Sequence, residues 1–224
     1  MAPQGNRSRG SDESYWCFQA DTKVQLRDSS KVAMKDLKPG DSVKVVKKDG
    51  GLAYSPYLAM LHFEPDENAT FLQIYIDGEK GPISLTPDHL IYATKNPQEI
   101  LESPILAKNV EEGMFVFVAD EESGKVAPAK VRGVREVEAT GYCAPLTEEG
   151  TIMADGVAAS CYADFDHGLS HMAFWPLRLL YWVMSTLGFG GKGEDVTKVG
   201  IHWYAKALMK VNNVLFHVQP AMAV

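Results

Sequence analysis

The sequence predicts a mainly β domain followed by a short helical region, and three observations carry this prediction. From Thr22 to Ala163, short β-branched runs alternate with Gly, Pro and Asp turns. Within this part, one block recurs at an offset of 73 residues, from Lys35 to Lys108. After Ala163, apolar residues follow the spacing of helices. We therefore expect a β-domain with a helical appendage.

The predicted strands are short and separated by turn residues. They cover Lys23–Leu26, Ser42–Val46, Phe71–Ile76, Ile83–Leu85, Leu90–Ala93, Met114–Val118 and Val131–Val137. Turns are predicted at Lys38–Asp41 and Asp49–Gly51.

The repeat indicates that the β-domain is duplicated. The block Lys35–Val45 recurs as Lys108–Val118, and a glycine turn and an apolar stretch follow each copy, at Gly51–Tyr54 and Gly124–Ala127. Two copies favour a pair of β-units related by a pseudo-two-fold axis, since a solenoid needs three or more repeats. The alternative is that two strands preceded by glycine turns look alike by chance.

The tail predicts two helices joined by the glycine-rich link Gly188–Gly193. Pro176 fits the first turn of the first helix, whose apolar face contains Leu177, Leu180, Tyr181, Met184 and Leu187, widened by Trp175, Leu179, Trp182 and Val183. Pro176 and Arg178 interrupt this apolar stretch, so we expect an interfacial or lipid-contacting helix and not a membrane span. The second helix has Ile201, Tyr204, Ala205, Leu208, Met209, Val211 and Leu215 on its buried side. A helical hairpin packed on the β-domain is the alternative.

Composition excludes several classes of function. The chain has 224 residues, is 46% hydrophobic and carries a formal charge of −7, which argues against a nucleic-acid footprint. Three cysteines are too few for a disulfide framework, and none are spaced as metal ligands, so we predict neither a metal nor a cofactor. Residues 1–16 are polar and contain no signal peptide.

Three motifs occur in an order that suits self-cleavage. Cys17 follows the polar leader, Thr86 and His89 lie at a predicted strand end, and Cys161 comes late in the chain. A chain with this layout can convert its own peptide bond between Trp16 and Cys17 into a thioester.

These motifs resemble the C-terminal autoprocessing domain of hedgehog proteins, whose core is called the Hint domain. The similarity runs from about Cys17 to about Val218 and includes the blocks Lys35–Val43, Thr86–His89, Ala144–Thr147, Glu149–Ile152, Val157–Ala163 and Gly200–Tyr204. The resemblance implies a Hint fold at 17–165, an acyl-donor leader at 1–16 and a sterol-recognition region at 166–224. Trp175, Leu179, Trp182, Trp203 and Tyr204 are its candidate sterol contacts.

The first step of the implied reaction is attack by Cys17 on the carbonyl of Trp16. Because the attack is intramolecular, proximity supplies much of the acceleration. The resemblance assigns to His89 the protonation of the departing amide nitrogen, and to Thr86 the orientation of the scissile amide. Hedgehog proteins have Gly where this chain has Trp16, which bears on the efficiency of the attack.

The second step implied by the resemblance transfers the acyl group to the hydroxyl of cholesterol, and this alcohol needs a base. At the family's acidic base position the chain has His62 in place of Asp, and imidazole titrates near neutrality. Glu64 or Asp66 is the equivalent if the alignment slips, and a surface strand residue is the alternative reading of His62.

The two later cysteines receive different predictions. The resemblance places Cys161 near the nucleophile, where the late thiol aids processing, and the alternative is a small buried core residue. Cys143 stands where hedgehog proteins carry apolar residues, so we predict a core position.

The leading prediction is a single-turnover, self-cleaving cysteine endopeptidase and sterol acyltransferase. It is expected to be a monomer that meets sterol and the membrane interface through its tail in the secretory pathway. One alternative is a Hint enzyme whose acceptor is water, a thiol or another lipid. Another is an inactive lipid-binding module, because Trp16 and His62 depart from the family pattern.

Overall fold

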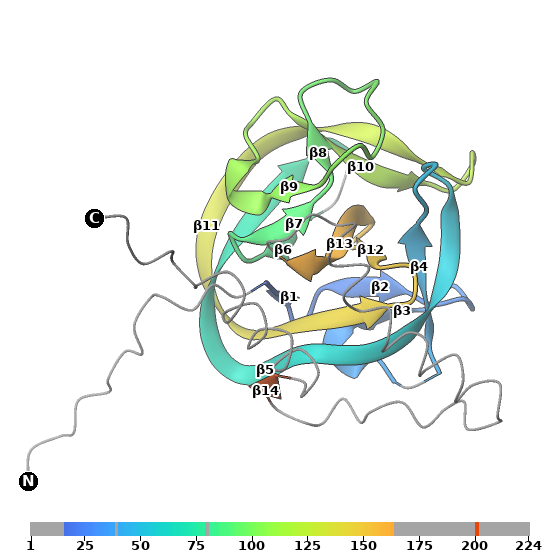
Figure 1. The fold of residues 1–224 in the computed structure, drawn as a ribbon. Helices are drawn as coiled ribbons and strands as arrows, with labels where there is room; N and C mark the ends of the chain where they lie inside the picture. Colours follow the sequence, from blue (N-terminus) through green and yellow to red (C-terminus); the bar gives the residue numbers. More distant parts are fainter. Residues whose placement is uncertain (1–15, 39, 79–80, 164–199, 202–224) are drawn as a thin grey trace, which may run out of the picture.

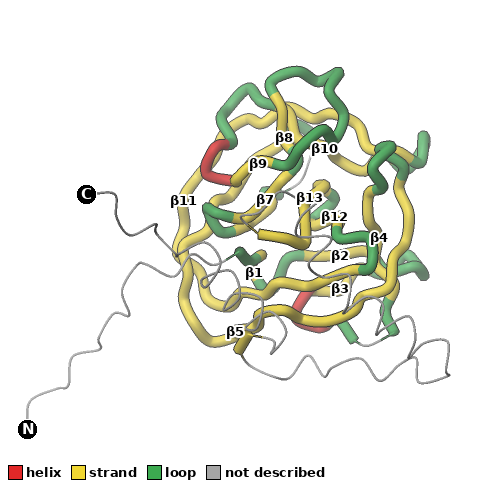
Figure 2. Tube along the Cα trace, in the orientation of Figure 1, coloured by secondary structure: helices red, strands yellow, loops and turns green. Residues whose placement is uncertain are grey.

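Strands dominate the fold, as predicted. The computed structural model describes residues 16–38, 40–78, 81–163 and 200–201. The helical segments of these residues are two 3₁₀ turns, η1 (Met34–Asp36) and η2 (Ala107–Asn109), shown in red in Figure 2. The prediction of a mainly β fold is confirmed.

The positions of the strands were predicted more accurately than their first and last residues. Each predicted strand overlaps an observed one, and β4 and β6 have the predicted bounds. The strands are β1 (Phe18–Gln19), β2 (Lys23–Gln25), β3 (Lys31–Ala33), β4 (Ser42–Val46), β5 (Leu52–Ile76), β6 (Ile83–Leu85), β7 (His89–Ile91), β8 (Ala93–Thr94), β9 (Ile105–Leu106), β10 (Phe115–Asp120), β11 (Lys125–Thr147), β12 (Thr151–Ala154), β13 (Val157–Ala163) and β14 (Gly200–Ile201).

Two long strands, β5 and β11, frame the molecule. They pair antiparallel from Ile76 opposite Val131 to Tyr57 opposite Thr147, with several register shifts. In the view of Figure 1 they run around the outside, and β1, β12 and β13 lie within the ring that they form. Their length escaped prediction because exposed polar residues, such as those at 66–68, interrupt the apolar alternation by which strands are recognised.

The internal repeat is a structural repeat. Three elements of the first unit have a counterpart that starts 73 residues later in the chain. The pairs are η1 and η2, β4 and β10, and β5 and β11. The turn before β4 has Gly40 at φ +94°, and the equivalent turn before β10 has Gly113 at φ +90°. Both turns need a residue that adopts left-handed φ without strain, which explains why glycine recurs. The predicted duplication of the β-unit is confirmed.

The larger of two apolar clusters in the described part of the chain contains residues from both halves of the β-domain. Phe18 of β1, Phe71 of β5, Leu85 of β6 and Leu146 of β11 are all fully buried in it. Cys17 belongs to the same cluster. The residue predicted to be the nucleophile therefore sits where many packed strands fix its position.

The predicted tail lies almost entirely outside the described residues. This holds for the first helix and for the sterol contacts Trp175, Leu179, Trp182, Trp203 and Tyr204. Gly200 and Ile201 form β14, which pairs with Phe63 and His62 of β5, so the prediction that Ile201 belongs to a helix is wrong. No helix among the described residues is long and apolar enough to cross a membrane.

Candidate active site

The position of Cys17 is set by β1, which directly follows it. Phe18 pairs with Leu85 of β6 on one side and with Cys143 of β11 on the other, so β1 is an internal strand. Cys17 is consequently fully buried. The peptide bond between Trp16 and Cys17 enters the core at this point.

Thr86 holds Cys17 by two hydrogen bonds. Thr86 directly follows β6, the neighbour of β1. The Cys17 backbone N–H donates to Thr86 Oγ1 at 3.0 Å, and the Thr86 N–H donates to the Cys17 carbonyl at 2.9 Å. The first of these N–H groups is the nitrogen of the scissile amide. Thr86 therefore fixes the bond that the predicted reaction breaks.

His89 is locked beside the same peptide bond. A turn places it after Thr86, with the His89 N–H donating to the Thr86 carbonyl at 3.0 Å. Its Nε2 lies 2.9 Å from the Ser160 carbonyl of β13, and its ring lies 4.1 Å from that of Phe18. A carbonyl only accepts, so Nε2 carries the hydrogen and Nδ1 of the neutral ring has a lone pair.

Burial keeps the His89 ring neutral. It lowers the pKa of His89 to about 4, although the carbonyls of Ser160 and Trp16 oppose the shift. The buried Nδ1 nevertheless has no hydrogen-bond partner among the described residues. The Trp16 carbonyl is thus close enough to act on the ring but does not satisfy Nδ1, so this nitrogen is available for proton transfer at the scissile bond.

His62 approaches the thiol of Cys17. It belongs to β5, and its Nδ1 lies 3.6 Å from Cys17 Sγ. Its Nε2 lies 3.7 Å from Glu64 Oε1, and the edge of its ring contacts Tyr142 at 5.1 Å between centroids. His62 is partly buried, with 12% of its side chain exposed. The reading of His62 as a surface strand residue does not fit this environment.

The Cys17 thiol is not ionised before it reacts. Burial raises its pKa well above the ordinary value, and the neighbouring Cys143 and Glu64 add to the rise, while a hydrogen bond with the Trp16 backbone opposes it. The predicted attack on Trp16 therefore requires a base that removes the thiol proton as the new bond forms. His62 Nδ1 is placed to be that base.

The other two cysteines are also free and buried. Cys143 is completely enclosed in the core, and burial raises its pKa strongly. Cys161 Sγ lies 3.7 Å from Thr147 Oγ1, and burial raises its pKa to about 11 although Thr147 opposes the shift. The hydrogen bonds and charge interactions given for Cys17 involve the Trp16 backbone, Thr86, His62, Cys143 and Glu64, and not Cys161.

Trp16, on the acyl side of the scissile bond, is half-buried. Its buried indole Nε1 has no hydrogen-bond partner in the described part of the chain. The indole thus occupies protein interior without a polar anchor.

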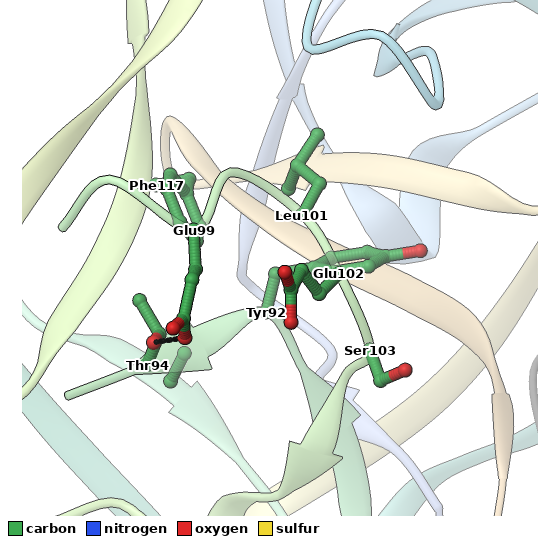
Figure 3. A pocket seen from close by; sticks show the side chains of 8 residues that line it. Tyr92, Thr94, Glu99, Leu101, Glu102, Ser103 and Phe117 are labelled. Atoms are coloured by element: carbon green, nitrogen blue, oxygen red, sulfur yellow. Dashed lines mark hydrogen bonds between the residues drawn. The ribbon is translucent and has the colours of Figure 1, made fainter. Parts of the chain in front are cut away.

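A separate pocket of about 150 Å³ is lined by residues between Tyr92 and Ser103 and by Phe117 of β10. Figure 3 shows Tyr92, Leu101 and Phe117 around it, with Glu99 accepting a hydrogen bond of 3.1 Å from Thr94. No cysteine or histidine lines it. Within the described ranges, no group of three His, Cys, Asp or Glu residues is arranged to hold a metal ion.

Two parts of the site were not assigned from sequence. The Ser160 carbonyl contacts His89. The one feature of the sequence that pointed to Ser160 was its position directly before Cys161. Glu64 was considered only as a substitute for His62, although residues two apart on a strand share a face and this spacing indicates a pair.

Comparison with solved structures identifies the class of fold. A mutant of the Ssp DnaB mini-intein superposes with a TM-score of 0.54 over 68% of this chain and 95% of the intein, at 8% sequence identity. At this identity the likeness shows the fold alone, which is that of the inteins.

The sequence comparisons identify the family. The Hint module family matches residues 5–217. Over 206 residues the chain is 33% identical to Sonic hedgehog protein of Danio rerio, covering 89% of this chain and 49% of that protein. Over 202 residues it is 36% identical to Indian hedgehog protein of Gallus gallus, covering 89% and 48%. The chain belongs to the Hint module family, and the predicted hedgehog-type Hint domain is confirmed.

The chain spans about half the length of the hedgehog relatives that it matches. Membership of the Hint family and the hedgehog relatives support self-processing as the class of activity.

Proposed function

We propose that the chain cleaves itself through a thioester at Cys17 and transfers the N-terminal fragment to a sterol hydroxyl. The observation that carries this proposal is the convergence on one buried peptide bond of a thiol, a hydroxyl acceptor and two imidazoles. Thr86 contacts the scissile nitrogen at 3.0 Å, and His62 contacts the thiol at 3.6 Å.

In the first step, Cys17 Sγ forms a bond to the carbonyl carbon of Trp16 and the bond from that carbon to the Cys17 nitrogen breaks. His62 Nδ1 accepts the thiol proton, and transiently protonated His89 gives one proton to the departing nitrogen. An imidazolium with a pKa of about 4 is a strong acid toward an amine, which suits this donation. Exchange with solvent restores both rings, so the net change is one proton moved from sulfur to nitrogen.

In the second step, the sterol oxygen attacks the thioester, an ester forms and the Cys17 thiol leaves. The attacking hydroxyl must lose its proton, and His62, neutral again, accepts it. The strand β14 supports delivery of the acceptor here, because Ile201 pairs with His62 itself. Gly200 and Ile201 therefore lie beside the base. This reaction requires no cofactor or metal.

The setting of the reaction belongs to the same proposal. The hedgehog relatives support a place in the secretory pathway, where the tail meets sterol at the membrane interface. Each chain acts once on itself, so a monomer is sufficient.

Intact mass spectrometry tests the proposal. The purified chain is incubated with cholesterol in detergent, with dithiothreitol, or with neither. The proposal predicts a fragment of residues 1–16 that carries the mass of the sterol ester only in the first sample. A fragment ending in a free acid in every sample would identify water as the acceptor. Full-length chain persisting in all three samples would identify an inactive module.

A truncation separates the tail from the chemistry. Removing residues 166–224 also removes β14, so the strand beside His62 is lost. We expect this variant to cleave with dithiothreitol but not with cholesterol. Equal cleavage by cholesterol in the truncated and full chains would remove the tail from the acceptor site.

A further inference from the structure

The face of β5 that carries His62 also carries Glu64. The two residues are two positions apart on one strand, so their side chains project from the same side. The carboxylate lies 3.7 Å from Nε2, while Nδ1 on the other side of the ring lies 3.6 Å from Cys17 Sγ. Thiol, imidazole and carboxylate thus follow one another in a line of contacts.

The position of the carboxylate bears on which ring nitrogen of His62 is free. A neutral imidazole can accept a proton from the thiol at Nδ1 only if its hydrogen is on Nε2. A carboxylate facing Nε2 favours that tautomer because it accepts hydrogen bonds and does not donate them. It also stabilises the imidazolium that forms when the thiol proton arrives.

The same carboxylate disfavours a free thiolate. Its charge contributes to the raised pKa of Cys17, after burial and Cys143. The negative charge therefore opposes ionisation of the thiol alone and favours transfer of its proton to His62. Both effects keep Cys17 protonated until the attack.

We propose that Glu64 is a positioning residue that orients His62 and raises its basicity, so that Cys17, His62 and Glu64 act as a relay. This inference rests on the proposed self-cleavage. It applies to the imidazole of this chain, because a carboxylate at position 62 has no tautomer to select. Glu64 would then be a like-charged neighbour and no longer a partner.

A double-mutant cycle tests the relay in the full chain. The rate of dithiothreitol cleavage is measured for wild type, Glu64→Gln, His62→Asp and the double variant. We expect Glu64→Gln to slow wild type by about 10- to 100-fold, by analogy with the loss of a partner that orients a metal-bound imidazole. In the His62→Asp background the same change should have no effect or should accelerate cleavage. Glu67→Gln, an exposed change on the same strand, is the matched control and should cleave as wild type does.

The pH profile separates basicity from a structural role. Cys17, Glu64 and Tyr142 are ionisable groups that face His62. His62 must be neutral to accept a proton, so the rate rises with pH through its pKa. Because loss of the carboxylate lowers that pKa, the rising limb should move to lower pH in Glu64→Gln. Glu64→Asp, which keeps the charge, should move it less.

Each failure has its own signature. If the wild-type chain cleaves and Glu64→Gln cleaves at the same rate with the same pH profile, the relay is overturned but the proposed function is not. If Glu64→Gln lowers the rate of dithiothreitol cleavage equally with His or with Asp at position 62, Glu64 has a structural role and the relay is also overturned. Absence of wild-type cleavage would overturn the proposed function and, with it, the relay.

Discussion

His62 and His89 both lie beside Cys17, but their surroundings differ in ways that control proton transfer. His89 is almost completely buried, packs on Phe18 and lies beside the backbone carbonyls of Ser160 and Trp16. His62 is partly exposed, contacts the thiol and has a carboxylate at 3.7 Å. The first environment lowers the affinity of the ring for a proton, whereas a carboxylate raises it.

This difference indicates a division of labour. A ring that holds a proton weakly is suited to release one to the departing nitrogen, and a ring supported by a carboxylate is suited to accept one. The pairing of β14 with His62 supports the proposal that the acceptor of the second step meets the same base. In the proposed mechanism His62 therefore acts in both steps, whereas His89 acts only in the first.

Cys17→Ala removes the thiol that both histidines serve, and it has the largest expected effect. Without it the thioester cannot form, and neither dithiothreitol nor cholesterol should release residues 1–16. Gel analysis of both reactions checks this. Release above background would show that another group attacks Trp16.

His89→Gln should abolish cleavage by both nucleophiles, because both depend on the thioester. The expected loss is about 10²–10⁴-fold, typical of removing a general acid or base. Matched time courses with dithiothreitol and cholesterol measure it. Normal dithiothreitol cleavage with only sterol transfer lost would place His89 in the second step and contradict its assignment to the first.

His62→Asp should keep sterol transfer but change its dependence on pH. Free imidazole becomes protonated below a pH of about 6.5, whereas an aspartate remains a base to a pH of about 4. Activity of the variant should therefore persist to lower pH than that of wild type. The rate of cholesterol cleavage is measured from pH 5 to 8. Identical profiles would place the base elsewhere, with Asp66 as the next candidate.

His89 also predicts a smaller effect on stability. Its pKa is about 4 in the folded chain, below that of an unfolded histidine, so the unfolded state binds more protons between these values. The stabilisation is fully present above a pH of about 6.5 and declines by about 3 kcal/mol as pH falls to 4. His89→Gln should lack this decline. Urea unfolding of Cys17→Ala with and without His89→Gln measures it, and parallel pH curves would contradict the buried neutral ring.

The sequence was most informative where local chemistry dictates structure. The Gly40 and Gly113 turns and the bounds of β4 followed from turn residues and alternation. The placement of Thr86 followed from its position directly after a predicted strand. What escaped depended on pairing across the fold, such as the contact of His89 with Ser160 or the entry of β14 beside His62. No local pattern encodes which distant strands become neighbours.

The ratio of cholesterol cleavage to dithiothreitol cleavage in His62→Ala and His89→Gln tests the division of labour most directly. An ionised thiol needs no base in the second step, whereas a sterol hydroxyl does. The ratio should therefore fall by about 10²–10⁴-fold in His62→Ala and stay at the wild-type value for any residual activity of His89→Gln. A ratio that is unchanged in His62→Ala, or that falls equally in both variants, would contradict the assignment of the second proton transfer to His62.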